Sequence, residues 1–278
     1  MSKLPEHEKE IKKESQDLFF EETNVSNAKQ YWFVIRELTG RELKRKYARS
    51  YLGVIWSILN PLLSMAVISF IFSYMFRRLI ENFPVYYLIG LTVWTLFRTA
   101  TDQSMTALVD NRNLLLRAKL PKYTFVLSRI NTAFVNFIYS FITLVVIMIY
   151  FKIEITWRVV LVIPVITLVL LFSLGIGLIL SIVYVFFADI KHLYEILLVL
   201  WMYMSAIFYP AEALPESAQR VLHYNPMFLA IDISRSVLQY GQLPATEEWM
   251  KLAFFTLVSF LFGIWVFMEY EGKVMRKI

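Results

Sequence analysis

The sequence contains no cysteine and only three histidines, which excludes disulfide bonds and thiolate metal sites. His7, His192 and His223 lie far apart along the chain, and their spacing matches no metal-binding pattern. Charge is also scarce: charged residues make up 18% of the chain, whereas globular proteins carry about 25%. Hydrophobic residues make up 58% and gather into long runs. This composition predicts an all-α protein that crosses a membrane several times.

The N-terminal region is polar and lacks the apolar segment of a cleaved signal peptide, so we expect the first membrane helix to direct insertion. Residues 1–26 are predicted to be a polar tail. Residues 27–50 are predicted to form an amphipathic helix in the cytoplasmic membrane interface, because Tyr31, Ile35 and Leu38 make an apolar stripe. Glu42 is expected to pair with Lys46, one turn further along this helix.

Apolar runs of about 20 residues predict six membrane-spanning helices within residues 54–268. The expected spans are roughly Val54–Phe76, Pro84–Leu108, Phe125–Phe151, Val159–Phe187, Leu193–Pro210 and Leu252–Met268. The fifth span is short. The residues after it, about 210–245, hold only short apolar runs, which predict re-entrant helices that form an extracytoplasmic gate. A purely structural lid is the alternative for this segment.

Charge bias predicts the orientation of these spans. Most of the 28 Lys and Arg residues fall on one side when both termini, the loop between spans two and three and the loop between spans four and five are placed together. The positive-inside rule makes that side cytoplasmic. We therefore expect a multi-pass protein of the plasma membrane with both termini in the cytoplasm, including a short tail at 269–278. Arg98 and Asp102, near the end of the second span, are expected to form an ion pair.

Three arginines form the first candidate binding site. Arg41, Arg45 and Arg49 recur every four residues and lead to the mouth of the first span. Such a stripe suits a phosphate or pyrophosphate headgroup, because guanidinium groups bind phosphate oxygens in bidentate fashion. An anchor that only fixes the topology is an equally good interpretation of this helix.

A short cytoplasmic helix, at about residues 109–120, forms the second candidate site. Pro121 is expected to end it. Its apolar and basic side chains make a compact surface suited to a groove on a partner protein, and simple contact with lipid is the alternative. The residues concerned are Leu114, Leu115, Arg117 and Lys119.

Aromatic residues form the third candidate site. Tyr194, Trp201 and Phe208 recur every seven residues, so they share one face of the fifth span. Aromatic rings stack on sugar rings, but they also pack against other helices, and packing is the favoured role for any single member.

Several stretches resemble one family of membrane proteins. RELKRKYARSYLGVIWSILNPLL, residues 41–63, resembles the signature of type-2 ABC exporter permeases that move lipid-linked polysaccharides, the O-antigen and teichoic-acid export group. NLLLRAKLPKY resembles the coupling helix of this family. FADIKHLYE resembles its second cytoplasmic loop, although Ala188 replaces the usual Arg. The matching residues are Tyr47, Ser50, Leu52, Gly53, Trp56, Asn60 and Pro61 in the signature, with Asn225, Pro226 and Arg235 before the last span.

The resemblance implies a homodimer of permease chains that works with two copies of a separate ABC ATPase, which binds ATP and Mg. The chain itself has no GxxxxGK[ST] phosphate loop, so we expect neither enzymatic activity nor a cofactor on it. The implied substrate is a polyprenyl-pyrophosphate-linked glycan, not a nucleic acid. By this resemblance the arginine stripe meets the pyrophosphate and the short cytoplasmic helix couples to the ATPase. The side chains expected to line the sugar path are Trp56, Phe70, Tyr74, Tyr194, Trp201 and Phe208.

Three other functions compete with this one. A type-2 ABC exporter of small hydrophobic drugs or lipids would share the fold and the topology. A secondary transporter needs acidic groups at bilayer depth, and no predicted span carries one near its middle. A membrane glycosyltransferase or lipid-phosphate enzyme needs clustered acids or histidines, whereas the predicted cytoplasmic loops offer only isolated acids, Asp110, Asp189 and Glu195.

Overall fold

The computed structural model describes residues 29–48, 53–76, 80–117 and 120–277. Every regular element in these ranges is a helix. The first is the N-terminal helix, residues 29–47, which lies inside the range predicted for the interface helix. It is followed by η1 (Gly53–Ile55), α2 (Trp56–Phe76), α3 (Phe83–Asp110), α4 (Arg112–Arg117), α5 (Tyr123–Tyr150), η2 (Trp157–Leu161), α6 (Val162–Phe186), α7 (Ile190–Tyr203), η3 (Ala211–Ala213), α8 (Glu216–Leu222), α9 (Pro226–Leu238) and α10 (Thr246–Lys277).

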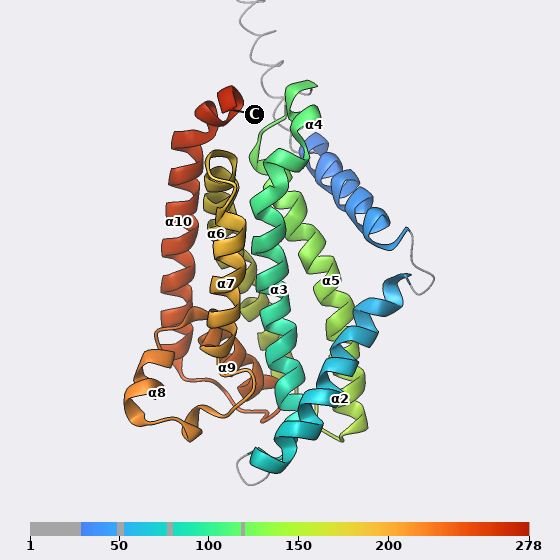
Figure 1. The fold of residues 1–278 in the computed structure, drawn as a ribbon. Coiled ribbons are helices and arrows are strands. Elements are labelled where there is room, and N and C mark those ends of the chain that lie inside the picture. Colours follow the sequence, from blue (N-terminus) through green and yellow to red (C-terminus); the bar gives the residue numbers. More distant parts are fainter. Residues whose placement is uncertain (1–28, 49–52, 77–79, 118–119, 278) are drawn as a thin grey trace, which may run out of the picture.

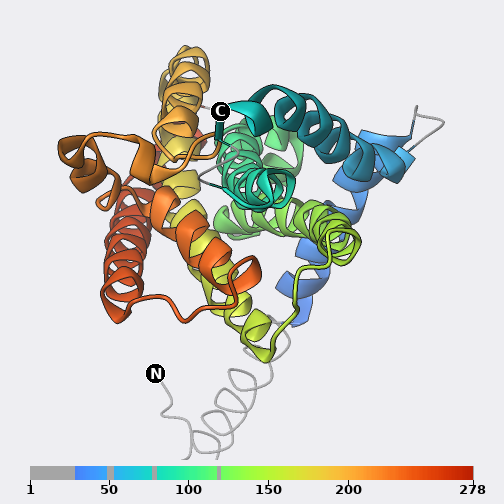
Figure 2. The same ribbon diagram turned by 90° about the horizontal axis from the view of Figure 1, so that it is seen from below.

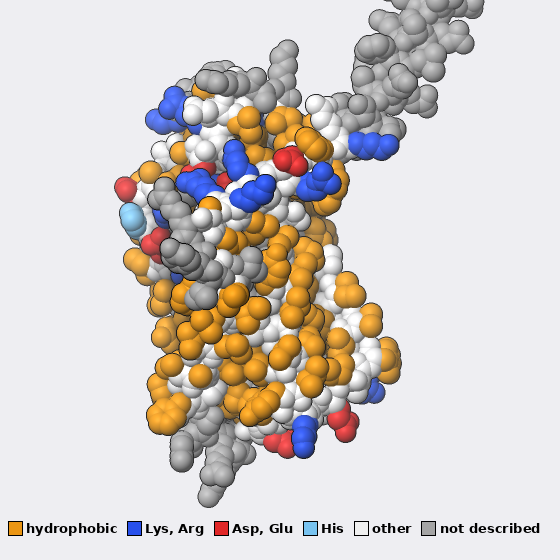
Figure 3. All heavy atoms as spheres, turned by 90° about the vertical axis from the view of Figure 1, so that its right-hand side faces the viewer, with side chains coloured by type: hydrophobic (Ala, Val, Ile, Leu, Met, Phe, Trp, Pro, Cys, Tyr) orange, Lys and Arg blue, Asp and Glu red, His pale blue; other side chains and the backbone are white. Residues whose placement is uncertain are grey.

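The long helices run roughly along one axis: α3, α6 and α10 run in one direction, and α2 and α5 run in the opposite direction (Figure 1). The N-terminal helix, α4 and the C-terminus lie at one end of the bundle, whereas α8 and α9 lie at the other (Figures 1 and 2). We call these the α4 end and the α8 end. On the face that Figure 3 shows, most charged side chains lie towards the two ends and hydrophobic side chains cover the region between them.

Three helices are long and apolar enough to cross a membrane: Tyr123–Tyr150, Trp157–Phe186 and Thr246–Val274. A shorter apolar helix covers Trp56–Phe72 within α2. The predicted all-α membrane fold is therefore confirmed in its class, while six crossings and re-entrant helices stay predictions. The fifth predicted span corresponds to α7, which has 14 residues, and the predicted gate corresponds to α8 and α9, with 7 and 13 residues.

Helix α3 is the centre of the bundle, although polar residues such as Thr92, Thr101 and Ser104 lie along it. It packs against α2, α5, α6 and α9, and Leu88 and Phe97 on it are fully buried. The predicted ion pair between Arg98 and Asp102 is wrong, because the described residues show no salt bridge at either side chain. Arg98 instead lies exposed on the surface of α3.

Helices α6 and α10 approach each other closely at two glycines. A Cβ atom on Gly175 would overlap the backbone of Ser259, and one on Gly263 would overlap the carbonyl oxygen of Gly175. Small residues allow two helix backbones to approach this closely, which is a common way for helices to associate in membranes. The glycines therefore fix where α6 and α10 cross.

Helix α7 lies on the outside of the bundle with most of its apolar surface uncovered. Tyr194 and Leu198 are its only buried residues, whereas Leu193, Ile196 and Leu200 are exposed. Along α2, the exposed large apolar side chains are Trp56, Ile58, Leu63, Val67, Phe70 and Ile71. Such faces suit lipid or another protein chain.

Candidate functional site

The N-terminal helix is fastened to the bundle by polar side chains. The Lys46 ammonium and the Tyr47 hydroxyl donate to Asn136 Oδ1 on α5, at 2.9 and 3.0 Å. Thr39, which is buried, donates to the carbonyl of Ser128, also on α5. The helix therefore packs along α5 at the α4 end, as Figure 1 shows.

A charged cluster strengthens this attachment. The Arg129 guanidinium, on α5, lies 2.8 Å from Glu42 of the N-terminal helix and 2.8 Å from Asp110 at the end of α3. The Arg129 and Glu42 side chains are 8% and 12% exposed, so water screens their attraction only weakly. Because Glu42 is engaged by Arg129, the described residues show no salt bridge between Glu42 and Lys46, and that predicted pair is wrong. We call Glu42, Asp110 and Arg129 the acid–arginine cluster.

The predicted arginine stripe begins beside this cluster. Arg41 donates a hydrogen bond of 2.5 Å to Asn111 Oδ1, directly before α4, and 53% of its side chain remains exposed. Arg45 is exposed on the same helix. Arg49 lies outside the described residues. Asn111 is itself buried, and its backbone carbonyl accepts hydrogen bonds from the first turn of α4. Arg41 is thus joined through one side chain to the start of α4.

Helix α4 and the N-terminal helix border one groove, with a volume of about 700 Å³. Leu114 and Leu120 line it from the α4 side, and Leu115 is buried beneath. The side chain of Arg117 and all of Lys119 lie outside the described residues. From the N-terminal helix the groove receives Phe33, Val34, Arg36, Glu37, Leu38, Gly40, Arg41 and Lys44. The result is an open surface that combines apolar contact with positive charge.

At the α8 end, the side chain of Arg235 lies in the interior and is 1% exposed. Its guanidinium donates to the carbonyl oxygens of Tyr86, Ala206 and Ile207 at 3.0–3.3 Å, and its Cζ lies 3.4 Å from the centroid of the Tyr86 ring. A Cβ on Gly90 would lie 2.8 Å from Nη2, so glycine is needed there to admit the side chain. Arg235 therefore fastens α9 to both α3 and the turn after α7.

That turn is strained. Ala206 has a φ of 49°, in the left-handed region that costs a non-glycine residue about 1 kcal/mol. The Tyr86 hydroxyl adds a hydrogen bond to the carbonyl of Tyr209, at 3.0 Å. The Tyr209 hydroxyl donates to the carbonyl of Tyr203 at 2.6 Å. The contacts around Arg235 hold the chain in a conformation that it would otherwise leave.

Asn225 makes the second link at this end. Its Oδ1 caps α9 by accepting from the backbone N–H groups of Met227 and Phe228, and it also accepts from the indole of Trp201 at 2.8 Å. Its Nδ2 donates to the carbonyl of Met204. One amide side chain thus joins the end of α7 to the start of α9.

Residues 34–239 match the family described as ABC-2 type transporter. The chain is 32% identical, over 82% of its length and 89% of the relative, to the O-antigen export system permease protein RfbA of Myxococcus xanthus. The chain belongs to the ABC-2 type transporter family.

Further relatives of this ABC-2 chain have similar names. It is 26% identical to an O-antigen export system permease protein RfbA of Klebsiella pneumoniae, over 83% of the chain and 89% of the relative. It is 27% identical to the polysialic acid transport protein KpsM of Escherichia coli, over 84% of the chain and 92% of the relative. The family resemblance found in the sequence is confirmed.

The predicted aromatic residues of this ABC-2 chain differ in how exposed they are. Phe70 is 80% exposed and Trp56 is 40% exposed on α2, whereas the side chain of Tyr74 lies outside the described residues. Tyr194 is buried, and its hydroxyl donates to Thr101 Oγ1 on α3 at 2.7 Å.

The other two aromatic residues, Trp201 and Phe208, are partly buried. Trp201 packs edge-on against Phe97, and Phe208 packs against the ring of Tyr87. A sugar path along all the predicted rings stays a prediction, and Tyr194 and Trp201 also serve packing within the chain.

The acid–arginine cluster and the role of Arg235 were missed from the sequence. Arg129 is the only charged residue of the predicted span Phe125–Phe151, and that isolation was the available signal, because a charge within an apolar helix needs a partner. Its partners lie 87 and 19 positions away, on two other helices, so spacing along the chain could not reveal them.

Proposed function

We propose that this chain is the transmembrane permease subunit of an ATP-driven exporter that moves lipid-linked polysaccharide across the plasma membrane. The observation that carries this proposal is the similarity to an O-antigen export permease over most of both chains. The polysialic acid transport protein among the relatives supports a polysaccharide substrate more broadly. The carrier is proposed to be a polyprenyl pyrophosphate, of the kind used for O-antigen or teichoic acid.

In the proposed arrangement the chain crosses the membrane six times, with the α4 end in the cytoplasm and α8 and α9 as re-entrant helices. The concentration of Lys and Arg in the segments assigned to the α4 end supports this orientation. Two copies would form the pore, because the apolar faces of α2 and α7 are uncovered in the single chain and offer a surface for a second copy. Two copies of a separate ATPase would supply the energy.

The groove between α4 and the N-terminal helix is the proposed docking surface for the ATPase. Its lining combines Leu114 and Leu120 with the basic Arg36 and Lys44, which suits a partner surface that is apolar at its centre and acidic at its rim. Movement of α4 would reach the bundle through the acid–arginine cluster, because that cluster ties the N-terminal helix to α3 and α5 directly behind the groove.

The arginine stripe is the proposed site for the pyrophosphate. Arg41 keeps more than half of its side chain exposed while it binds Asn111, so phosphate oxygens can reach the rest of its guanidinium. Substrate that binds Arg41 would therefore also act on its hydrogen-bond partner Asn111, the residue directly before α4. In this proposal the carrier headgroup and the ATPase act on the same short helix at one groove, because Arg41 also lines the proposed docking surface.

The α8 end is the proposed exit. Arg235 and Asn225 fasten α9 to α3 and to the end of α7, so opening a path here requires α9 to move together with the turn at Ala206. The strain at Ala206 would lower the cost of that movement, because the open state releases it.

Deletion of the gene in its host would test the proposal. We expect lipid-linked glycan to accumulate on the cytoplasmic side and to disappear from the cell surface, and we expect the intact gene to restore export. Normal surface glycan together with increased sensitivity to lipophilic drugs would instead support the drug-exporter alternative. Antibody labelling of intact and permeabilised cells distinguishes the two locations of the glycan.

A further inference from the structure

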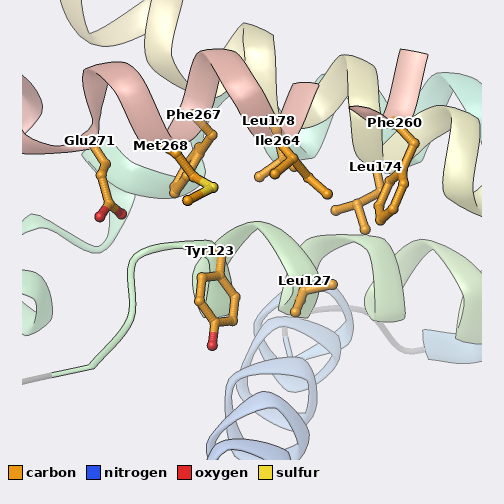
Figure 4. Close-up of a pocket in the computed structure, with 9 residues that line it drawn as sticks. All are labelled: Tyr123, Leu127, Leu174, Leu178, Phe260, Ile264, Phe267, Met268 and Glu271. Atoms are coloured by element: carbon orange, nitrogen blue, oxygen red, sulfur yellow. The ribbon is translucent and has the colours of Figure 1, made fainter. Parts of the chain in front are cut away.

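An apolar groove opens between α5, α6 and α10, on a different part of the molecule from the groove beside α4. Its volume is about 510 Å³. Figure 4 shows Tyr123 and Leu127 of α5 on one side, facing side chains of α6 and α10 on the other. Helix α6 packs against both α5 and α10, and the contact at Gly175 and Gly263 holds α10 close to α6. Helix α5 therefore stands apart from α10, and the space between them remains unfilled.

The surroundings of this groove indicate what fills it. Leu174 and Leu178 of α6 and Phe260 and Ile264 of α10 make its interior apolar. All three helices are long and apolar enough to cross a membrane, so the groove faces hydrocarbon where the protein is embedded. Apolar cavities do not retain water, because a water molecule there finds no hydrogen-bond partners. Hydrocarbon is then the material available to occupy it.

The length of the groove matches one leaflet. From Phe260 to Glu271 it follows α10 for about 16 Å at the rise of an α-helix. The hydrocarbon core of a bilayer is about 30 Å thick, so the groove covers roughly half of it. One acyl chain of a single leaflet has the right extent, whereas a chain that crosses the bilayer does not fit.

Polar groups lie at one end only. Glu271 closes the groove at the α4 end, and Lys122, at the start of α5, lies 3.9 Å from its carboxylate. The Glu271 side chain is 41% exposed and the Lys122 side chain is 19% exposed. A loose, accessible pair of opposite charges complements a headgroup that itself carries a phosphate and an ammonium group, because each headgroup charge then meets its opposite.

We propose that this groove binds one acyl chain of a zwitterionic phospholipid, with the headgroup phosphate at Lys122 and the headgroup ammonium at Glu271. Phosphatidylethanolamine carries this combination of charges. The assignment to the cytoplasmic leaflet rests on the orientation given under the proposed function, whereas binding itself does not. Lys122 lies directly before α5, in the segment that follows α4. A lipid bound to Lys122 and Glu271 would therefore connect this segment to the C-terminal part of α10.

Lipid retention by the purified protein tests this proposal. The permease and its ATPase, purified together in mild detergent, are mixed with phosphatidylethanolamine or phosphatidylglycerol and examined by native mass spectrometry. We expect one retained phosphatidylethanolamine for each permease chain, and at least tenfold less of phosphatidylglycerol. Equal retention of the two lipids, or retention of neither, would overturn the proposal.

Two variants locate the site. L127W places a large ring in the groove and should reduce phosphatidylethanolamine retention at least tenfold. Its matched control is L257W on the exposed face of α10, which should retain the lipid as the unaltered chain does. E271Q leaves the apolar lining intact and should remove the preference for phosphatidylethanolamine over phosphatidylglycerol. This variant tests the site even if L127W does not fold. Equal retention by L127W and L257W, or an unchanged preference in E271Q, would contradict the assignment. Neither ATP nor glycan is present, so the result is independent of export.

Discussion

Replacement of Arg129 by methionine probes how the N-terminal helix is held. In R129M the carboxylates of Glu42 and Asp110 lose the guanidinium that lies 2.8 Å from each of them. Removing one partner of a buried ion pair costs about 3–5 kcal/mol. The Asp110 side chain is 42% exposed and water can solvate it, so we expect the lower end, about 3 kcal/mol.

This cost should appear as opening of the N-terminal helix. A loss of about 3 kcal/mol corresponds to backbone amides that exchange on the order of 100-fold faster at residues 29–47, if local opening governs their exchange. Hydrogen exchange followed by mass spectrometry measures this on peptides from that range, with peptides from α6 as the internal reference. The matched control is R220M, because Arg220 forms an exposed pair with Glu216 whose side chains are 80% and 88% exposed.

Equal rates of amide exchange over residues 29–47 in R129M and R220M would contradict the conclusion that the acid–arginine cluster holds the N-terminal helix. A second variant makes the comparison sharper. The triple change E42Q, D110N and R129M removes all three charges together, so no unpaired charge remains in the interior. We expect it to exchange much more slowly than R129M alone. If the triple variant opened as readily as R129M, packing by the arginine chain and not charge pairing would explain the effect.

Three further predictions concern other parts of the molecule. R235M removes the guanidinium donor from three backbone carbonyls, so amides of the turn around Ala206 should exchange on the order of 100-fold faster, and unchanged exchange there would contradict the bracing role. G263V forces a branched side chain into the backbone of α6, and the loss of about 3 kcal/mol or more should lower the melting temperature of the purified protein, whereas F262V beside it should have little effect. R45E combined with R49E should abolish export while membrane insertion and dimer assembly persist, and normal surface glycan in that variant would remove the headgroup role.

Much of the fold could be predicted because membrane helices carry a strong signal in a single sequence. The apolar runs placed α2, α5 and α6 within a few residues of their observed bounds. The last span was predicted as 252–268, but α10 extends from Thr246 to Lys277 because its polar ends continue the same helix. Hydropathy detects the part of a helix that suits lipid, not the part that projects beyond it.

The candidate sites could be predicted only where neighbours in sequence act together. The stripe at Arg41 and Arg45 follows from helical spacing within one segment. Arg235 was noticed only through the family resemblance, and nothing in its surroundings in sequence shows that its partners are the carbonyls of Tyr86 and Ala206. Every residue has a backbone carbonyl, so the sequence does not show which carbonyls accept hydrogen bonds from Arg235. Only the folded structure identifies them.

The most direct measurement of the central claim is transport by the reconstituted complex. The permease is placed in liposomes with its ATPase, and movement of polyprenyl-pyrophosphate-linked glycan across the bilayer is followed by an enzyme or lectin confined to one side. We predict transport that requires both proteins and ATP hydrolysis, and none by the permease alone. Transport by the permease alone, or by the complete complex without ATP, would contradict the account.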